Sequence, residues 1–148
     1  MAQGSKPRIA IVEDDSILCF MMTEMCKSAG FEVVGCVGDG LSALDVVNRS
    51  RPDYLILDFN LDGEWNGLEL IEKAKETAPG IGTVLVTAWD INDIASRMEG
   101  EQPNRILRKP VPPHVLVEVI DHMEELRQAG RQQAIAIHSG TGGSARTH

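Results

Sequence analysis

Short apolar runs alternate along the chain with longer segments in which apolar residues recur every three or four positions. The runs read RIAIV, VVGCV, YLILD, TVLVT and RILRK, and they cover residues 8–12, 33–37, 54–58, 83–87 and 105–109. The segments between and after them cover residues 16–29, 41–50, 68–78, 91–98 and 113–129. These patterns are typical of buried strands and amphipathic helices, so the chain predicts five βα units.

The strands are predicted to form a parallel sheet. Residues 54–57 and 84–86 are apolar at every position, as in sheets that helices cover on both faces. Glycines and prolines mark the ends of the predicted elements: Gly30, Pro52, Pro79 and Gly130. The fold class that follows is α/β, doubly wound, with a central sheet.

The length of 148 residues predicts one domain, with no room for a second, effector domain. We expect an N-terminal extension over 1–7, the domain over 8–130 and a flexible tail over 131–148. The tail ends in Gly, Ser and Thr, and it lacks a sustained apolar period. An alternative is that Ile135 and Ile137 dock on the domain or on a partner.

Composition excludes several classes of protein. No apolar run approaches the roughly 20 residues of a membrane-spanning helix, so no membrane contact is expected. The opening MAQGSKPR has no apolar segment of a secretory signal, which predicts a cytoplasmic protein. A formal charge of −8 argues against nucleic-acid binding, which needs clustered Lys and Arg.

The three cysteines are predicted to be reduced thiols of the core. Cys19 and Cys26 lie seven residues apart in a helical segment, which places them on one apolar face. Their spacing differs from that of metal ligands.

Charged and polar side chains gather where the predicted strands end. Glu13 and Asp14 follow the first strand, Asp58 ends the third, Thr87 ends the fourth and Lys109 ends the fifth. Because ligands of doubly wound sheets bind outside the carboxyl ends of the strands, we expect these groups to converge. Three carboxylates would repel one another unless a cation lay among them, and an all-oxygen set suits Mg²⁺.

These groups also fit phosphoryl chemistry. The carboxylate of Asp58 can attack phosphorus and form an aspartyl phosphate once its surroundings neutralise the phosphoryl oxygens. Lys109 supplies a positive charge, and Thr87 can donate a hydroxyl hydrogen bond. The small side chain of Ala88 leaves room for the incoming group.

From about Arg8 to about Arg127 the chain resembles the receiver domain of two-component response regulators, of the stand-alone, single-domain type. The resemblance rests on four motifs in register: VEDD, LILDFN, VTAWD and LRKP. It implies a flavodoxin-like (βα)5 sandwich with strand order 2-1-3-4-5. It also implies that Asp14, Asp58 and the backbone carbonyl of Asn60 bind Mg²⁺ directly, that Glu13 acts through water, and that the peptide bond before Pro110 is cis.

The resemblance further implies a function. A histidine kinase or histidine phosphotransfer protein would donate the phosphoryl group to Asp58, and an unknown downstream protein would read the result by protein–protein contact. Such a domain promotes its own phosphorylation and dephosphorylation without being an enzyme in the usual sense. We expect a monomer or a weak homodimer.

Two positions depart from the family pattern. Receivers usually carry a switching aromatic residue shortly before the lysine, where this chain has Ile106. Output is therefore predicted to pass through Trp89 or the fourth helix. Trp89 could also hinder the water that hydrolyses the phosphoryl group, or it could simply pack on the loop. The loop after Asp58, NLDGEWNG, lacks the usual proline, and Gly63 and Gly67 are predicted to supply its turns.

Two other functions compete with phosphorylation-controlled signalling. A pseudo-receiver would keep the fold and use protein contacts alone, as the missing aromatic switch suggests. An aspartate-nucleophile phosphatase is the other, because Asp58 is followed closely by further polar residues, but those enzymes carry the nucleophile on the first strand.

Overall fold

The computed structural model describes residues 6–61, 63–98 and 100–144, with side chains up to Gln133. Ten elements follow one another: β1 (Arg8–Val12), α1 (Ser16–Ser28), β2 (Glu32–Val37), α2 (Gly40–Ser50), β3 (Tyr54–Asp58), α3 (Gly67–Thr77), β4 (Gly82–Thr87), α4 (Ile91–Ala95), β5 (Arg105–Arg108) and α5 (Pro113–Ser144). The predicted alternation of strands and helices is confirmed.

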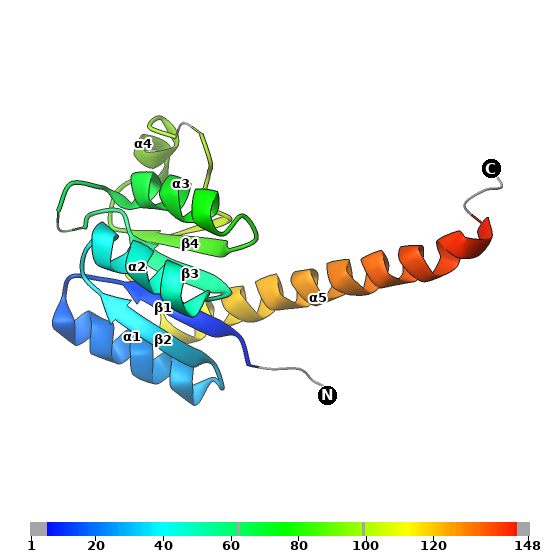
Figure 1. Ribbon diagram of the computed structural model, residues 1–148. Coiled ribbons are helices and arrows are strands. Elements are labelled where there is room, and N and C mark those ends of the chain that lie inside the picture. The colour runs from blue at the N-terminus through cyan, green and yellow to red at the C-terminus, as the bar shows by residue number, and fades with distance from the viewer. Residues whose placement is uncertain (1–5, 62, 99, 145–148) are drawn as a thin grey trace. The chain divides into compact units, whose positions relative to one another are not determined.

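The five strands form one parallel sheet in the order β2-β1-β3-β4-β5 (Figure 1). Val12 of β1 pairs with Leu57 of β3, and Asp58 pairs with Val86 of β4. This register brings the ends of the three central strands to the same edge of the sheet. The predicted doubly wound fold and strand order are therefore confirmed.

The helix starts follow from local hydrogen bonds. The carboxylate of Asp15 accepts from the backbone N–H groups of Ile17 and Leu18, so Asp15 caps α1. At the start of α3, Asn66 and Glu69 form a capping box, in which each side chain bonds the other residue's backbone N–H. Asp15 lies three residues after β1, and Asn66 closes the longer loop that follows β3.

Two helix ends differ from the prediction. The fourth helix ends at Ala95 and not at residue 98. Just after this end, the Ser96 hydroxyl donates to the carbonyl oxygen of Asp93 at 2.7 Å. Such a local bond competes with helix continuation. The fifth helix runs on to Ser144 and not to residue 129. A glycine inside a helix costs only about 1 kcal/mol, and the Gln and Ala residues after Gly130 favour helix.

The chain divides into two compact units, residues 1–117 and 118–148, and α5 contributes to both. The domain boundary at 130 and the flexibility of 131–148 stay predictions. The side chains of Ile135 and Ile137 lie outside the described residues. Among the residues that the structure describes, no helix is long and apolar enough to cross a membrane. Residence in the cytoplasm stays a prediction.

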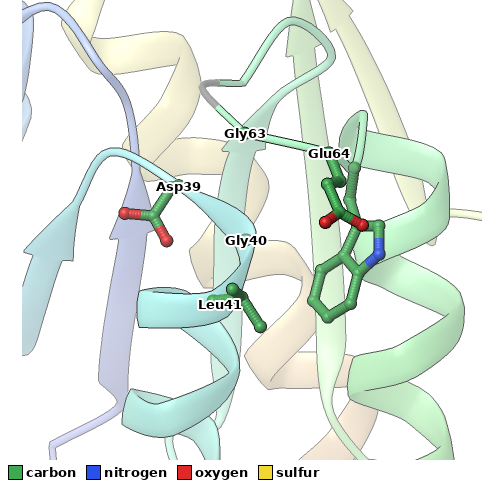
Figure 2. Close-up of a pocket in the computed structure, with 6 residues that line it drawn as sticks. Asp39, Gly40, Leu41, Gly63 and Glu64 are labelled. Carbon is green, nitrogen blue, oxygen red and sulfur yellow. The ribbon is translucent and has the colours of Figure 1, made fainter.

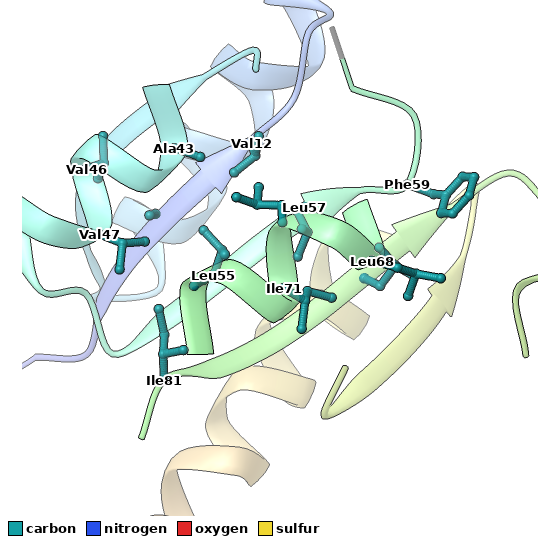
Figure 3. Close-up of a cluster of buried hydrophobic side chains, with 14 of the residues drawn as sticks. Val12, Ala43, Val46, Val47, Leu55, Leu57, Phe59, Leu68, Ile71 and Ile81 are labelled. Carbon is teal, nitrogen blue, oxygen red and sulfur yellow. The ribbon is translucent and has the colours of Figure 1, made fainter. Parts of the chain in front are cut away.

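The core of the first unit lies between the sheet and the helices α2 and α3 (Figure 3). Leu55 and Leu57 point from β3 toward Val47 of α2 and Ile71 of α3, and all four are fully buried or nearly so. Burying an aliphatic side chain of this size stabilises the fold by about 1.5–3 kcal/mol. This packing fixes β3, whose last residue is Asp58.

The prediction of three reduced thiols is wrong. Cys19 of α1 and Cys36 of β2 form a disulfide, with their Cα atoms 6.3 Å apart. Cys26 remains a free, buried thiol. The two paired residues belong to different elements, and helical spacing along the sequence does not reveal that a residue of α1 lies next to a residue of β2.

Candidate phosphorylation and metal site

Three carboxylates meet at the carboxyl edge of the sheet. Glu13 and Asp14 follow β1, and Asp58 is the last residue of the neighbouring strand β3. One carboxylate oxygen from each lies within 4.8 Å of the other two. The predicted convergence of these three residues is therefore observed.

Lys109 lies across from this cluster, just after β5. Its ammonium donates to Asp58 Oδ2 at 2.8 Å and to Glu13 Oε1 at 3.4 Å. The pair with Asp58 is a short, charge-assisted hydrogen bond, and it is largely shielded because the Asp58 side chain is only 10% exposed. Lys109 thus joins the ends of β1, β3 and β5 in one site.

Burial and charge shift two ionisations. Burial raises the pKa of Glu13 above its ordinary value, although the Asp15 N–H and the Lys109 ammonium act in the opposite direction. Burial alone would lower the pKa of Lys109, but the hydrogen bonds and charges of Asp58 and Glu13 outweigh it and raise that pKa. The ammonium is therefore held firmly in its charged form.

Thr87 lies at the end of β4, beside β3, and is fully buried. Its hydroxyl oxygen accepts a hydrogen bond from the backbone N–H of Trp89 at 3.0 Å. The Trp89 ring packs on Phe59, with centroids 5.0 Å apart, and the Arg97 guanidinium lies 4.8 Å from the ring centroid. The hydroxyl beside the acceptor is thus connected to the loop before α4 and to the segment after it.

The donor set fits a hard divalent cation. Three carboxylates within 4.8 Å of one another offer oxygen ligands, and Mg²⁺ binds through one or two carboxylates while keeping several waters. The backbone N–H of Asn60 donates to Asp58 Oδ1 at 3.3 Å, which holds the start of the next loop close to the acceptor. These residues could hold Mg²⁺.

The remaining predicted positions surround the site. Ala88 is exposed, and the peptide bond between Lys109 and Pro110 is cis as expected. Ile106 is half-buried and packs with Trp89 against the core. An aliphatic residue therefore occupies the place of the switching aromatic.

Sequence reasoning missed the role of Gly67. Gly63 has a φ of 91° and supplies a turn as predicted, but Gly67 serves a different purpose. A Cβ atom on Gly67 would lie 2.5 Å from the carbonyl oxygen of Asp58 and 2.8 Å from Leu85 Cδ1. Only glycine allows α3 to begin this close to the acceptor, and the sequence signal was limited to a glycine preceding a helical pattern.

Two hollows flank the site. An apolar one of about 430 Å³ lies beside Glu13 and Lys109 and is lined also by Met22 and Met25 of α1. Another, of about 370 Å³, lies between the loop before α2 and the loop before α3 (Figure 2). Its lining residues are Asp39, Gly40, Leu41, Gly63, Glu64 and Trp65, none of which was predicted as a site residue.

Comparison with models of known protein families identifies the family of this chain. The family model described as "Response regulator receiver domain" matches residues 9–121. The chain belongs to this family. The match covers β1 from Ile9 onward, the other four strands, the acidic cluster, Thr87 and Lys109. Aspartyl phosphorylation and an acidic Mg²⁺ pocket are characteristic of receiver domains, and the residues found here fit both.

The curated relatives are longer proteins. The DNA-binding response regulator MtrA of Mycobacterium tuberculosis is 34% identical over 113 residues, which cover 76% of this chain and 48% of that protein. The probable transcriptional regulatory protein TcrX of the same organism is 32% identical over 89 residues, which cover 60% of this chain and 37% of that protein. This chain thus spans about half the length, or less, of these relatives.

Solved structures agree with the fold. The receiver domain protein (CheY-like) of Methanospirillum hungatei superposes with a TM-score of 0.75 at 26% identity, covering 85% of this chain and 99% of that one. The receiver domain of the response regulator AraT from Geobacillus stearothermophilus gives 0.71 at 28% identity, covering 83% and 97%. Both likenesses extend over nearly the whole of the other chain.

Proposed function

We propose that this chain is a phosphorylation-controlled signalling domain in which Asp58 accepts a phosphoryl group. One observation carries the proposal: the Asp58 carboxylate lies 2.8 Å from the Lys109 ammonium and within 4.8 Å of two further carboxylates. A surface ion pair alone would not need the acidic cluster. Asp58 beside a cation-binding set and a fixed ammonium is the arrangement that in-line phosphoryl transfer requires.

Each residue has a separate task in the proposed transfer. Asp58 attacks the phosphorus, and the bond from phosphorus to the donor breaks. Lys109 moves its hydrogen bond from the carboxylate to a phosphoryl oxygen, and the Thr87 hydroxyl donates a hydrogen bond to another. Asp14, Asp58 and the carbonyl of Asn60 would hold Mg²⁺, with Glu13 acting through water, and the ion when bound supplies charge neutralisation of the phosphoryl oxygens.

Output is proposed to pass through Trp89. The Thr87 hydroxyl oxygen now accepts from the Trp89 N–H, and a hydroxyl that turns toward a phosphoryl group would change that bond. Trp89 in turn packs on Phe59 and carries Arg97 over its ring. A change at the acceptor can therefore reach the segment around α4, β5 and the start of α5, which we propose a downstream protein reads.

The phosphoryl donor is proposed to be a histidine kinase or a histidine phosphotransfer protein, as for other receivers. MtrA is named as DNA-binding, but its match to this chain covers only 48% of its length. We propose contact with proteins and none with nucleic acid, in keeping with a charge of −8. The proposed assembly is a monomer or a weak homodimer.

Intact-mass measurement after incubation with acetyl phosphate and Mg²⁺ tests the proposal. We expect the wild type to gain the mass of one phosphoryl group, and Asp58→Asn to gain nothing. Asp45→Asn is the matched control, because Asp45 is an exposed carboxylate paired with Arg49 on α2. A wild type that gains no phosphoryl group in the presence of Mg²⁺ would favour the pseudo-receiver.

A phosphatase would behave differently in the same experiment. It would release phosphate from a small phosphomonoester repeatedly without accumulating aspartyl phosphate. The proposed domain instead accumulates one modified residue per chain and does not turn over such esters. Measuring released phosphate alongside the protein mass separates the two functions.

A further inference from the structure

The cysteine pair lies outside the acceptor site but next to one of its loops. Cys19 is in the first turns of α1, and Cys36 is the residue before the end of the edge strand β2. Their Cα atoms are 6.3 Å apart, within the range of about 4.4–6.8 Å that disulfides span. Both residues are half-buried, so small oxidants and reductants can reach them.

We propose that Cys19 and Cys36 form a reversible redox site, whose disulfide locks the start of α1 onto β2 and whose dithiol form releases it. The proposal that this disulfide is reversible rests on the size of the domain. A core of this extent forms without covalent staples, which domains need mainly when they are much smaller. A disulfide that the fold does not need is free to serve as a switch.

The third cysteine shows why only this pair reacts. Cys26 lies two turns further along α1, and it is fully buried. Burial raises the pKa of its thiol to about 11, so it stays protonated and unreactive at neutral pH. The same helix therefore carries one cysteine that faces a partner and one that has none within the described chain.

The oxidant is proposed to be a peroxide. One thiolate of the pair attacks an oxygen of hydrogen peroxide, the O–O bond breaks, and a sulfenic acid and hydroxide form; the hydroxide becomes water by taking up the proton that the thiol had released. The second thiol attacks the sulfenic sulfur, the S–S bond forms, the S–O bond breaks, and the hydroxyl leaves as a second water with the proton of that thiol. Peroxide takes both electrons, and a dithiol reductant returns them by thiol–disulfide exchange.

The link to the acceptor runs through the acidic loop between β1 and α1. The Glu13 N–H donates to the Val37 carbonyl oxygen at 2.8 Å, and Val37 follows Cys36. At the other end of the loop, Asp15 caps the helix that carries Cys19. The disulfide therefore joins the two segments between which Glu13 and Asp14 are held. Any effect of this disulfide on phosphorylation of Asp58 rests on the proposed function of the site.

Thiol counting tests the redox site itself. Wild type is treated with hydrogen peroxide or with a dithiol reductant, denatured and alkylated, and its mass is measured. With three cysteines in the chain, we expect three alkyl groups on the reduced form and one on the oxidised form. Oxidised Cys26→Ala should carry none, whereas Cys19→Ser and Cys36→Ser should each keep two. Loss of the disulfide in Cys26→Ala, or linkage between two chains, would overturn the proposal.

Hydrogen exchange tests whether the disulfide holds the start of α1 on β2. In metal-free buffer, the amides of residues 13–20 should exchange more slowly in the oxidised wild type than in the reduced one. The melting temperature should rise on oxidation by about 5–15 °C for a loop of this length. Both changes should also occur in Asp58→Asn, so they do not depend on phosphorylation, and they should vanish in Cys36→Ser. Equal exchange in the two redox forms would contradict the switch.

Discussion

The buried carboxylate of Glu13 should make the stability of the metal-free protein depend on pH. Its pKa is raised in the folded state, chiefly by burial, so the folded chain holds the proton more tightly than the unfolded chain. This contribution is fully present below the ordinary carboxyl pKa of 4.5 and is lost as pH rises through the raised pKa. Ionised Glu13 therefore weakens the apo fold at neutral pH.

The measurement is a difference between two proteins. Urea unfolding in EDTA, repeated from pH 4.5 upward, should show wild type losing stability relative to Glu13→Gln over this window. Other carboxylates titrate in both proteins and cancel in the difference. Parallel curves for the two proteins would mean that Glu13 ionises in the fold as it does in the unfolded chain.

Gly67 should tolerate no side chain. A Cβ there would come within 2.5 Å of a backbone oxygen of Asp58, so either α3 or the acceptor strand must shift. We expect Gly67→Ala to lower the free energy of unfolding by about 1–3 kcal/mol, as overpacking does. Chemical denaturation measures this loss.

Gly80 offers the matched control, because nothing lies within 4 Å of a Cβ atom built there. Gly80→Ala should leave stability unchanged or raise it by up to about 1 kcal/mol, since it restricts only the unfolded chain. Equal losses in both variants would show that the close approach of Gly67 to Asp58 has no energetic weight.

At the scale of elements, the strands were predictable and some helix ends were not. The run YLILD is apolar throughout and ends in a carboxylate, so β3 and its site residue follow from the sequence alone. Lys109 and Thr87 follow in the same way from their strands. The end of α4 depends on a hydroxyl bond at Ser96, and the continuation of α5 depends on a glycine that merely weakens helix. The pattern of apolar residues predicts neither the end of α4 nor the continuation of α5.

Contacts between elements were the part that the sequence could not supply. The disulfide joins α1 to β2, and the ring pair joins Phe59 of one loop to Trp89 of another. Spacing along the chain carries no information on either, because both depend on how helices lie on the sheet. The acidic site was predictable since parallel strands bring their carboxyl ends to one edge.

The loop between β4 and α4 should control how long the phosphoryl group lasts. Trp89 packs on Phe59, the residue that follows Asp58. We predict that its ring hinders the water that hydrolyses the phosphoryl group. We expect Trp89→Ala to speed autodephosphorylation severalfold, measured as decay of the phosphorylated mass after the donor is removed. Trp65→Ala is the control, because Trp65 packs beside Gly40 and under Lys73. An unchanged decay rate in Trp89→Ala would leave Trp89 with packing alone.

At the scale of the whole molecule, the negative charge acts on both reactants. A net charge of −8 raises the local concentration of divalent cations and opposes the approach of anionic phosphodonors. A divalent cation bound among the three carboxylates, together with the Lys109 ammonium, offsets their negative charge at the point where the donor arrives. Charge on the surface and charge in the site therefore both favour metal binding before phosphorylation.

Metal binding should accordingly stabilise the fold by mass action. A ligand that binds only the folded chain adds about 2.7 kcal/mol at one hundred times its dissociation constant, so Mg²⁺ should raise the melting temperature by about 5–15 °C. Asp14→Asn should remove most of this rise.

In EDTA the same variant should melt slightly higher than wild type, because one of three mutually repelling carboxylates is gone. Asp45→Asn, at an exposed position of α2, should follow wild type in both conditions. If Asp14→Asn instead responded to Mg²⁺ as wild type does, the stabilising ion would lie elsewhere on the acidic surface and not among Glu13, Asp14 and Asp58.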